Sequence, residues 1–253
     1  MKKILLWGFV LPILAVTGYA LYYLYGPTPQ ITGQQWRVHD TSRPQPEIVS
    51  PGDSLGMVVP PAGSQVLFDG SSLDHFSNQS LAIENGAMVM GVGGQGTLDG
   101  FGDVQLHVEW ASPNPPAGNG QNRGNSGVIF MGLYEVQVLD SYQNETYPDG
   151  QAGALYGVRP PSVNVSRPPG EWQSYDIDFE APVFNADGSL RSPAYATVVH
   201  NGVLVQHKQA YNGPSTWRRN GRYEAHKSKL PLRLQWHGSP VRYRNIWVRS
   251  LHQ

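Results

Sequence analysis

Glu135, Gln137 and Asp140 are polar residues in a short run that is otherwise apolar, and two of them carry carboxyl groups. The intervening Val136 and Val138 favour a β-strand, whose side chains alternate between two faces. Glu135 and Gln137 should therefore share one face, which Asp140 joins only if a bulge after Val138 adds a residue. Polar groups on a buried strand are costly unless they meet a ligand, water or partners. We therefore expect a functional site on this strand.

Two other predicted strands also carry a polar face opposite an apolar one. One of these strands contains His107 and Glu109, and the other contains Gln235 and His237. Such a face is either solvent-exposed surface or the floor of a cleft. For His107 we expect surface, whereas the sequence leaves the choice open for Glu109.

The elements that position these residues are predicted to be short strands joined by turns. Asn85-Gly86 and Asn201-Gly202 are typical of two-residue hairpins, and His200 and His207 beside the second are expected to face solvent. No helix is predicted beyond the N-terminal segment. At least ten strands indicate an all-β fold, with two packed antiparallel sheets in a sandwich or jelly roll. The predicted strands cover residues 65–69, 81–84, 87–90, 104–110, 127–130, 134–139, 173–179, 196–200, 203–206, 232–236 and 241–248.

The composition excludes several kinds of site. The chain has 253 residues and no cysteine, so it has no disulfide, no thiolate metal ligand and no cysteine nucleophile. A formal charge of -1 gives no reason to expect nucleic acid or an anionic membrane surface as a partner. The 29 glycines and 21 prolines favour short strands and many turns.

Residues 1–26 are predicted to be separate from the fold. Lysines precede an apolar run over residues 4–25, which is long enough to span a bilayer as a helix of about 20 residues. The alternative is a signal peptide that is cleaved near Ala20. Either way the globular part is expected in the cell envelope outside the cytoplasm, membrane-anchored or secreted. Residues 27–63 are predicted to form a Pro/Gly-rich linker or an arm lying on the domain, which covers residues 64–253.

A series of short motifs over roughly three quarters of the chain carries a family resemblance. Each motif is weak alone, but their order is specific. In chain order they are Leu67-Phe-Asp-Gly70, Glu84-Asn-Gly86, Phe101-Gly-Asp103, Glu109-Trp110, Asn125-Ser-Gly127, Tyr134-Glu-Val-Gln-Val-Leu-Asp-Ser141, Gly153-Ala-Leu-Tyr-Gly157, Pro169-Gly-Glu-Trp172, Asn201-Gly202, Leu234-Gln-Trp-His-Gly238 and Val241-Arg-Tyr-Arg-Asn-Ile246. The ordered set resembles the 3-keto-disaccharide hydrolase domain family.

The resemblance implies a concanavalin A-like jelly roll with a carbohydrate-binding face. It also implies cleavage of 3-keto-glycosides by elimination between C1 and C2, followed by hydration. β-Glucanases of the same fold carry three acidic residues on a strand of this face. Gln137 stands where the middle acid would be, which argues against an ordinary retaining mechanism. A plain β-glucan hydrolase and a non-catalytic carbohydrate-binding module remain as alternatives.

The chemistry of such a substrate assigns roles to the polar residues. A ketone at C3 acidifies the C2 proton, so cleavage needs a base, an acid and donors for the enolate oxygen. The candidate catalytic residues are Glu135, Asp140 and His237. A structural ion pair is the alternative for Asp140, with Arg244 as one conceivable partner. The candidate substrate-binding residues are Asn125, Gln137, Arg244, Glu109, Gln235 and Tyr156.

The remaining expectations concern aromatic residues and partners. Trp172 is predicted to pack in the core, and the loop over residues 211–229, which contains Trp217, is predicted to border the cleft. The sequence requires no cofactor and places no metal ligand, although jelly rolls of this type often hold Ca²⁺. The expected partner is an oligosaccharide or glycoside. The oligomeric state is left open.

Overall fold

The computed structural model describes residues 26–52 and 59–251, which form β-strands and two short 3₁₀ helices, η1 (Gly120–Asn122) and η2 (Pro148–Gly150). The described part contains no α-helix, as predicted. The strands are β1 (Glu47–Ile48), β2 (Gln65–Phe68), β3 (Ile83–Glu84), β4 (Ala87–Val89), β5 (Gln95–Phe101), β6 (Val104–Ala111), β7 (Ser126–Phe130), β8 (Tyr134–Val138), β9 (Val163–Asn164), β10 (Gln173–Glu180), β11 (Val183–Phe184), β12 (Leu190–Ser192), β13 (Tyr195–His200), β14 (Val203–Ala210), β15 (Leu230–Leu234) and β16 (Arg242–Ser250).

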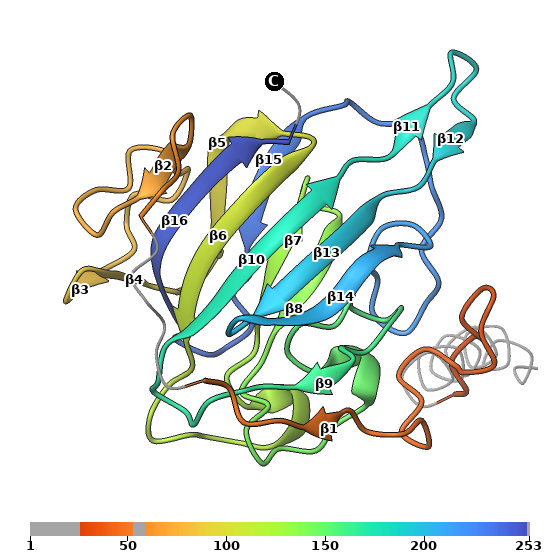
Figure 1. Ribbon diagram of the computed structural model, residues 1–253, viewed down its shortest axis with the longest axis horizontal. Coiled ribbons are helices and arrows are strands. Elements are labelled where there is room, and N and C mark those ends of the chain that lie inside the picture. Colours follow the sequence, from red (N-terminus) through yellow and green to blue (C-terminus); the bar gives the residue numbers. More distant parts are fainter. Residues whose placement is uncertain (1–25, 53–58, 252–253) are drawn as a thin grey trace, which may run out of the picture.

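Two sheets are layered one on the other (Figure 1). The larger sheet has the strand order β14-β13-β10-β6-β16-β4-β3, with β2 also paired to β16. The smaller sheet has the order β5-β15-β7-β8. Every pairing within these two sheets is antiparallel. The prediction of an all-β fold with two packed antiparallel sheets is therefore confirmed.

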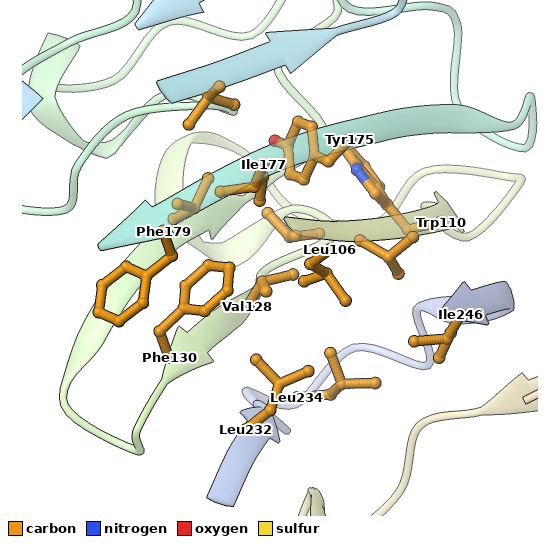
Figure 2. Packing of buried hydrophobic residues seen from close by; sticks show 14 of the residues in the cluster. Leu106, Trp110, Val128, Phe130, Tyr175, Ile177, Phe179, Leu232, Leu234 and Ile246 are labelled. Carbon is orange, nitrogen blue, oxygen red and sulfur yellow. The ribbon is translucent and has the colours of Figure 1, made fainter. Parts of the chain in front are cut away.

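The facing sides of the two sheets form one apolar core. Figure 2 shows side chains of both sheets pointing toward one another, and the rings of Phe130 and Phe179 stack with centroids 4.5 Å apart. Tyr134, Val136 and Val138 of β8 are all fully buried in this core. Because strand side chains alternate, the residues between them must face away from the larger sheet. The core thus fixes which face of the smaller sheet is left for a site.

The two predicted hairpins are confirmed. Glu84 pairs with Ala87, and His200 pairs with Val203, so two residues form each turn. In both turns the Asn and the following Gly have positive φ, between 50° and 80°. This is the backbone of a type I′ turn, which Asn-Gly adopts at low cost.

Strand β5 was missed by the sequence pattern. Its sequence, Gln-Gly-Thr-Leu-Asp-Gly-Phe, contains two glycines and an aspartate, which are all depleted in strands. Pairing with β15 outweighs this poor local preference. Glycine is also needed here, because a Cβ at Gly100 would lie 3.0 Å from the backbone nitrogen of Leu230.

The expectation that His200 faces solvent is wrong. Its side chain is in the core, with the residue only 1% exposed. The imidazole is 3.3 Å from Gln173 Oε1, and its ring packs edge-on against Tyr175 and beside Trp110. Burial lowers the pKa of His200 to about 3, so the ring is neutral at physiological pH. His207, which follows the same hairpin turn, is exposed as expected.

Residues 26–52 lie as an arm against the sandwich. Ile31 and Val38 are buried, and β1 forms a short parallel pair with β9. The arm places His39 beside the smaller sheet's outer face, where it contacts residues described below. The predicted membrane anchor or signal segment over residues 1–26 lies almost wholly outside the described residues. Within the described ranges, no helix is long and apolar enough to cross a membrane.

Candidate active site

A cavity of about 490 Å³ opens on the outer face of the smaller sheet. Its floor comes from residues of β7 and β8 and from the residues after β15. Loops around η1, η2 and residue 215 provide its walls. The residues that line it are Gln121, Asn122, Asn125, Ile129, Gly132, Leu133, Glu135, Gln137, Tyr147, Tyr156, Ser215, Trp217, Gln235 and His237.

Glu135 is the single carboxylate among the described lining residues of this cavity. The residue is 7% exposed, and no donor within the described part of the chain bonds its carboxyl group. Burial without a partner raises the pKa of Glu135 to about 8. A carboxylate that is this basic is well suited to proton transfer near neutral pH.

Gly127 on the neighbouring strand leaves the space that the Glu135 carboxyl occupies. A Cβ placed at residue 127 would lie 2.4 Å from Glu135 Oε1, which is far inside van der Waals contact. The φ of Gly127 is not in the left-handed region, so the backbone itself does not require glycine. The absence of a side chain at residue 127 therefore sets the position of the Glu135 carboxyl group.

Side-chain amides form a connected network on one side of Glu135. Gln137 donates from Nε2 to Gln121 Oε1 at 3.0 Å, and its own Oε1 accepts the Val138 N–H. Gln121 donates to the Gly150 carbonyl at 2.9 Å. Asn125 donates to the Gln121 carbonyl at 2.7 Å. These bonds fix the amide orientations, so the amides present defined donors and acceptors to a ligand.

Two tyrosines form another part of the cavity wall. The hydroxyls of Tyr147 and Tyr156 are 3.0 Å apart. Burial raises the pKa of both phenols above the ordinary range, and the nearby Glu135 contributes to the shift. Both phenols are therefore neutral hydrogen-bond donors throughout the physiological pH range.

His39, from the arm over residues 26–52, packs against both tyrosines. The ring of His39 stacks on Tyr147 with centroids 3.9 Å apart, and it lies 5.0 Å from Tyr156. The backbone N–H of His39 donates to Asp149 Oδ2 at 2.9 Å, and the Asp149 carboxylate is buried. The walls of the cavity thus depend on a segment that precedes the sandwich in the chain.

The loop over residues 211–229 closes the cavity from a third side. Glu135 donates its backbone N–H to Ser215 Oγ at 3.0 Å, which fixes the loop to β8. Trp217 lines the cavity and is 44% exposed, so its ring is available at the rim. The prediction that this loop borders the cleft is therefore confirmed.

The structure brings six of the nine predicted site residues together around this cavity. They come from β8, from the residue before β7, from the residues after β15 and from the loop after η2. These six residues are Glu135, Gln137, Asn125, Gln235, His237 and Tyr156.

Asp140 is not in this cavity, because β8 ends at Val138 and no bulge returns the chain to the same face. Its carboxylate forms an ion pair with Arg123, in which Nη2 donates to Oδ1 at 2.9 Å and Nε lies 2.9 Å from Oδ2. Burial raises the pKa of Asp140, and the attraction of Arg123 offsets only part of this shift. The structural ion pair considered for Asp140 is present, with Arg123 instead of Arg244 as the partner.

Glu109 and Arg244 also lie away from the cavity, on the outer face of the larger sheet. Arg244 Nε is 2.6 Å from Glu109 Oε2, so Glu109 and not Asp140 is its partner. The guanidinium of Arg244 lies over the ring of Trp172, 4.0 Å from its centroid. Trp172 is half-buried under this cation, which corrects the expectation that it packs in the core.

His107 belongs to the same cluster and is fully buried, which contradicts the expectation of a surface residue. The ring of Trp247 stacks on it at a centroid distance of 5.4 Å. Its Nδ1 is 2.7 Å from Asp176, and its Nε2 is 3.7 Å from Glu109. Burial lowers the pKa of His107, but the hydrogen bond to Asp176 and the nearby Glu109 carboxylate outweigh it and raise the pKa to about 9. Burial raises the pKa of Glu109, yet the nearby His107 and the hydrogen bonds from Asn245 and Arg244 lower it to about 2.

The His107 cluster makes stability depend on pH. A histidine whose pKa rises from 6.5 to about 9 on folding stabilises the protein fully below pH 6.5. This contribution is lost as the pH rises through 9. In urea unfolding, the difference in free energy between the wild type and His107→Gln should shrink by on the order of 2 kcal/mol from pH 6 to pH 10. A difference that does not change with pH would contradict this account.

Several residues of the site were not predicted from the sequence: His39, Gln121, Tyr147 and Ser215. The role of Gly127, which leaves space for the Glu135 carboxyl group, was also not predicted. Apart from Gly127 they lie in loops, in the arm or in the short helix η1, where no alternation indicates a face. No group of three or more His, Asp or Glu side chains within the described ranges could hold a metal ion.

Comparison with known proteins agrees with the motif order. The model of the 3-keto-alpha-glucoside-1,2-lyase-like domain matches residues 63–249. A crystal structure of a provisionally assigned glycosyl hydrolase from Parabacteroides distasonis is 37% identical, with a TM-score of 0.75, over 88% of this chain and 100% of that one. Another from the same organism shares the fold at 20% identity and a TM-score of 0.55, over 74% and 99% of the two chains. No curated protein matches the sequence. The chain therefore belongs to the 3-keto-alpha-glucoside-1,2-lyase-like domain family.

Proposed function

We propose that this protein cleaves 3-keto-glycosides in the cavity on the smaller sheet, with Glu135 as the group that moves the proton. The observation that carries the proposal is the buried, unpartnered Glu135 carboxyl among hydrogen-bonding amides and phenols. An isolated buried carboxyl is costly, so its retention needs a reason outside folding. Proton transfer to and from a substrate supplies that reason.

The reaction needs one proton to leave C2 of the substrate. In its ionised form Glu135 accepts this proton, and the released electron pair forms the C1–C2 double bond as the C1–O bond breaks. The leaving oxygen takes a proton from His237, which lies at the rim. Water then adds to C1 and gives its proton to His237, while Glu135 returns its proton to C2, so both residues are regenerated and the net change is hydrolysis. One hydroxyl of the Tyr147–Tyr156 pair donates to the other, and the proton that remains is a donor suited to the enolate oxygen at C3.

The number of carboxylates in the cavity argues against a plain β-glucan hydrolase. Retaining glycosidases place two carboxyl groups about 5–5.5 Å apart, and inverting ones about 6.5–9.5 Å apart. Here a single carboxylate lines the described cavity, while Asp140 is held outside it by Arg123. A ketone at C3 removes the need for a second carboxylate, because the C2 proton is already acidified.

Three finer expectations belong to the same proposal. We take the sandwich to be a concanavalin A-like jelly roll, and we place the protein in the cell envelope. There the apolar run over residues 4–25 would anchor it or direct its secretion. Its substrate is an oligosaccharide or small glycoside.

The substrate class is tested by incubating the full-length protein with a 3-keto-disaccharide and with the parent disaccharide. We expect sugar release from the oxidised substrate and release at least 10²-fold slower from the parent, because only the ketone acidifies C2. Release from the parent alone would favour the plain hydrolase. Binding of both sugars without release from either would favour the carbohydrate-binding module.

A further inference from the structure

A second cavity, of about 340 Å³, adjoins the candidate active site. Asn122 lines both cavities, and His237 of the first is followed in the chain by Gly238 of the second. Asn122, His237 and Gly238 are all exposed, so they form a shared rim and not a buried partition. The residues around the second cavity are Pro113, Pro116, Ala117, Gly118, Asn122, Arg123, Gly124, Asp140, Gly238, Ser239 and Pro240.

We propose that this second cavity is the subsite for the leaving group of the substrate, and that it accepts a second sugar ring. This inference rests on the proposed cleavage of a glycoside in the first cavity. A glycoside has two parts joined by one oxygen, and two cavities that share a rim can hold one part each. The oxygen would then lie at the rim, beside His237, which is where the leaving oxygen must receive its proton.

The chemistry of the second cavity suits a sugar. Its volume is at the lower end of the range for small-molecule sites, about 300–1,000 Å³. Pro113, Pro116 and Pro240 offer flat apolar surfaces that match the C–H faces of a pyranose ring. Arg123 adds polar donors, because its Nη1 has no hydrogen-bond partner among the described residues.

The ion pair at this cavity is rigidly held. Arg123 donates to one carboxylate oxygen of Asp140 and to the Tyr142 carbonyl, and its Nε lies 2.9 Å from the other carboxylate oxygen. Gly124 is packed so closely that a Cβ there would lie 2.9 Å from the Asp140 and Ser112 Cβ atoms. Asp140 thus acts as a positioning residue that orients Arg123, and it need not reach the reacting atoms.

The test fills the second cavity without touching the first. Ala117 is exposed and lines only the second cavity, so Ala117→Trp should occupy it while the chain still folds. Ser239→Trp fills it from a different segment of the chain and serves as an independent variant. Asn119→Trp is the matched control, because Asn119 is exposed in the same loop and lines neither cavity.

The substrates are a 3-keto-disaccharide and methyl 3-keto-glucoside, whose leaving group is only methanol. Ala117→Trp and Ser239→Trp should raise KM for the disaccharide at least 10-fold and change kcat/KM for the methyl glycoside less than 2-fold. Asn119→Trp should change neither. Equal losses on both substrates, or no loss on the disaccharide, would overturn the subsite.

Calorimetric binding separates this inference from the proposed function. If the wild type turns over neither substrate, the proposed function fails. The subsite would still stand if the disaccharide binds and both filling variants weaken its binding 10-fold. Disaccharide binding that is undetectable or unchanged in both variants would overturn the subsite as well.

Discussion

Glu135→Gln is expected to lower kcat on a 3-keto-disaccharide by about 10³-fold, which is the usual scale for removing a positioned proton-transfer group. Glutamine has nearly the same shape but cannot accept the C2 proton. Sugar binding should change little, because the amides and phenols of the cavity remain. The measurement is kcat and KM for the variant, together with the calorimetric Kd for the substrate.

The same substitution should change the dependence of stability on pH. The pKa of Glu135 rises from 4.5 to about 8 on folding, so the folded wild type retains a proton that the unfolded chain releases between these values. Stability therefore falls as pH rises from about 4.5 to 8, and Glu135→Gln should remove this fall, a few kcal/mol at most. Full activity in the variant would contradict the assigned role, whatever its stability.

Gly127→Ala should lower kcat/KM by about 10²-fold although Glu135 is unchanged. The new Cβ would lie 2.4 Å from Glu135 Oε1, so the carboxyl group must move by about 1 Å or more. A displacement of that size can cost about 10²-fold in rate when a reaction depends on orientation. The contacted atoms are the flexible end of a side chain, so we expect the fold to persist.

Gly96→Ala is the matched control for Gly127→Ala. Gly96 also lies in a strand of the smaller sheet, and a Cβ there would meet nothing closer than 3.4 Å. Its activity should stay within 2-fold of the wild type. The positioning account would fail if Gly127→Ala kept full activity, or if both alanine variants lost activity equally.

Alternation along the strands was sufficient to predict the floor of the cavity. Val136 and Val138 enter the core, so Glu135 and Gln137 must face the other way, and the structure places both in the cavity. The same logic applies to Gln235, which follows Leu234. These predictions succeed because a strand with one buried face has only one register that keeps its apolar residues inside.

The alternation of polar and apolar residues along each strand could not predict which polar faces lie on the same side of the molecule. Glu109 and Gln235 lie on polar faces of different sheets, and the sandwich directs these faces to opposite sides of the molecule. A register shift in β16 lets Arg244 stand opposite Glu109 and Trp247 opposite His107. One extra residue in that stretch reverses the alternation, and a bulge of this kind leaves no signal in the pattern of apolar residues.

Other wall residues of the cavity could not be predicted, for a different reason. Tyr147 and Gln121 lie in or beside single-turn helices, and His39 comes from the arm. Their positions depend on contacts between segments that are distant in sequence, such as the bond from His39 to Asp149. A single sequence carries no periodic signal for contacts of this kind.

The central claim is that cleavage proceeds through removal of the C2 proton. It is tested most directly by running the reaction of a 3-keto-disaccharide in D₂O and measuring deuterium at C2 of the released 3-keto-sugar by mass spectrometry and NMR. Early time points and a control of free 3-keto-sugar correct for spontaneous exchange. We predict deuterium at C2 in nearly every product molecule, because Glu135 exchanges its proton with solvent before returning it. Release of a 3-keto-sugar that retains its original hydrogen at C2 would contradict the account.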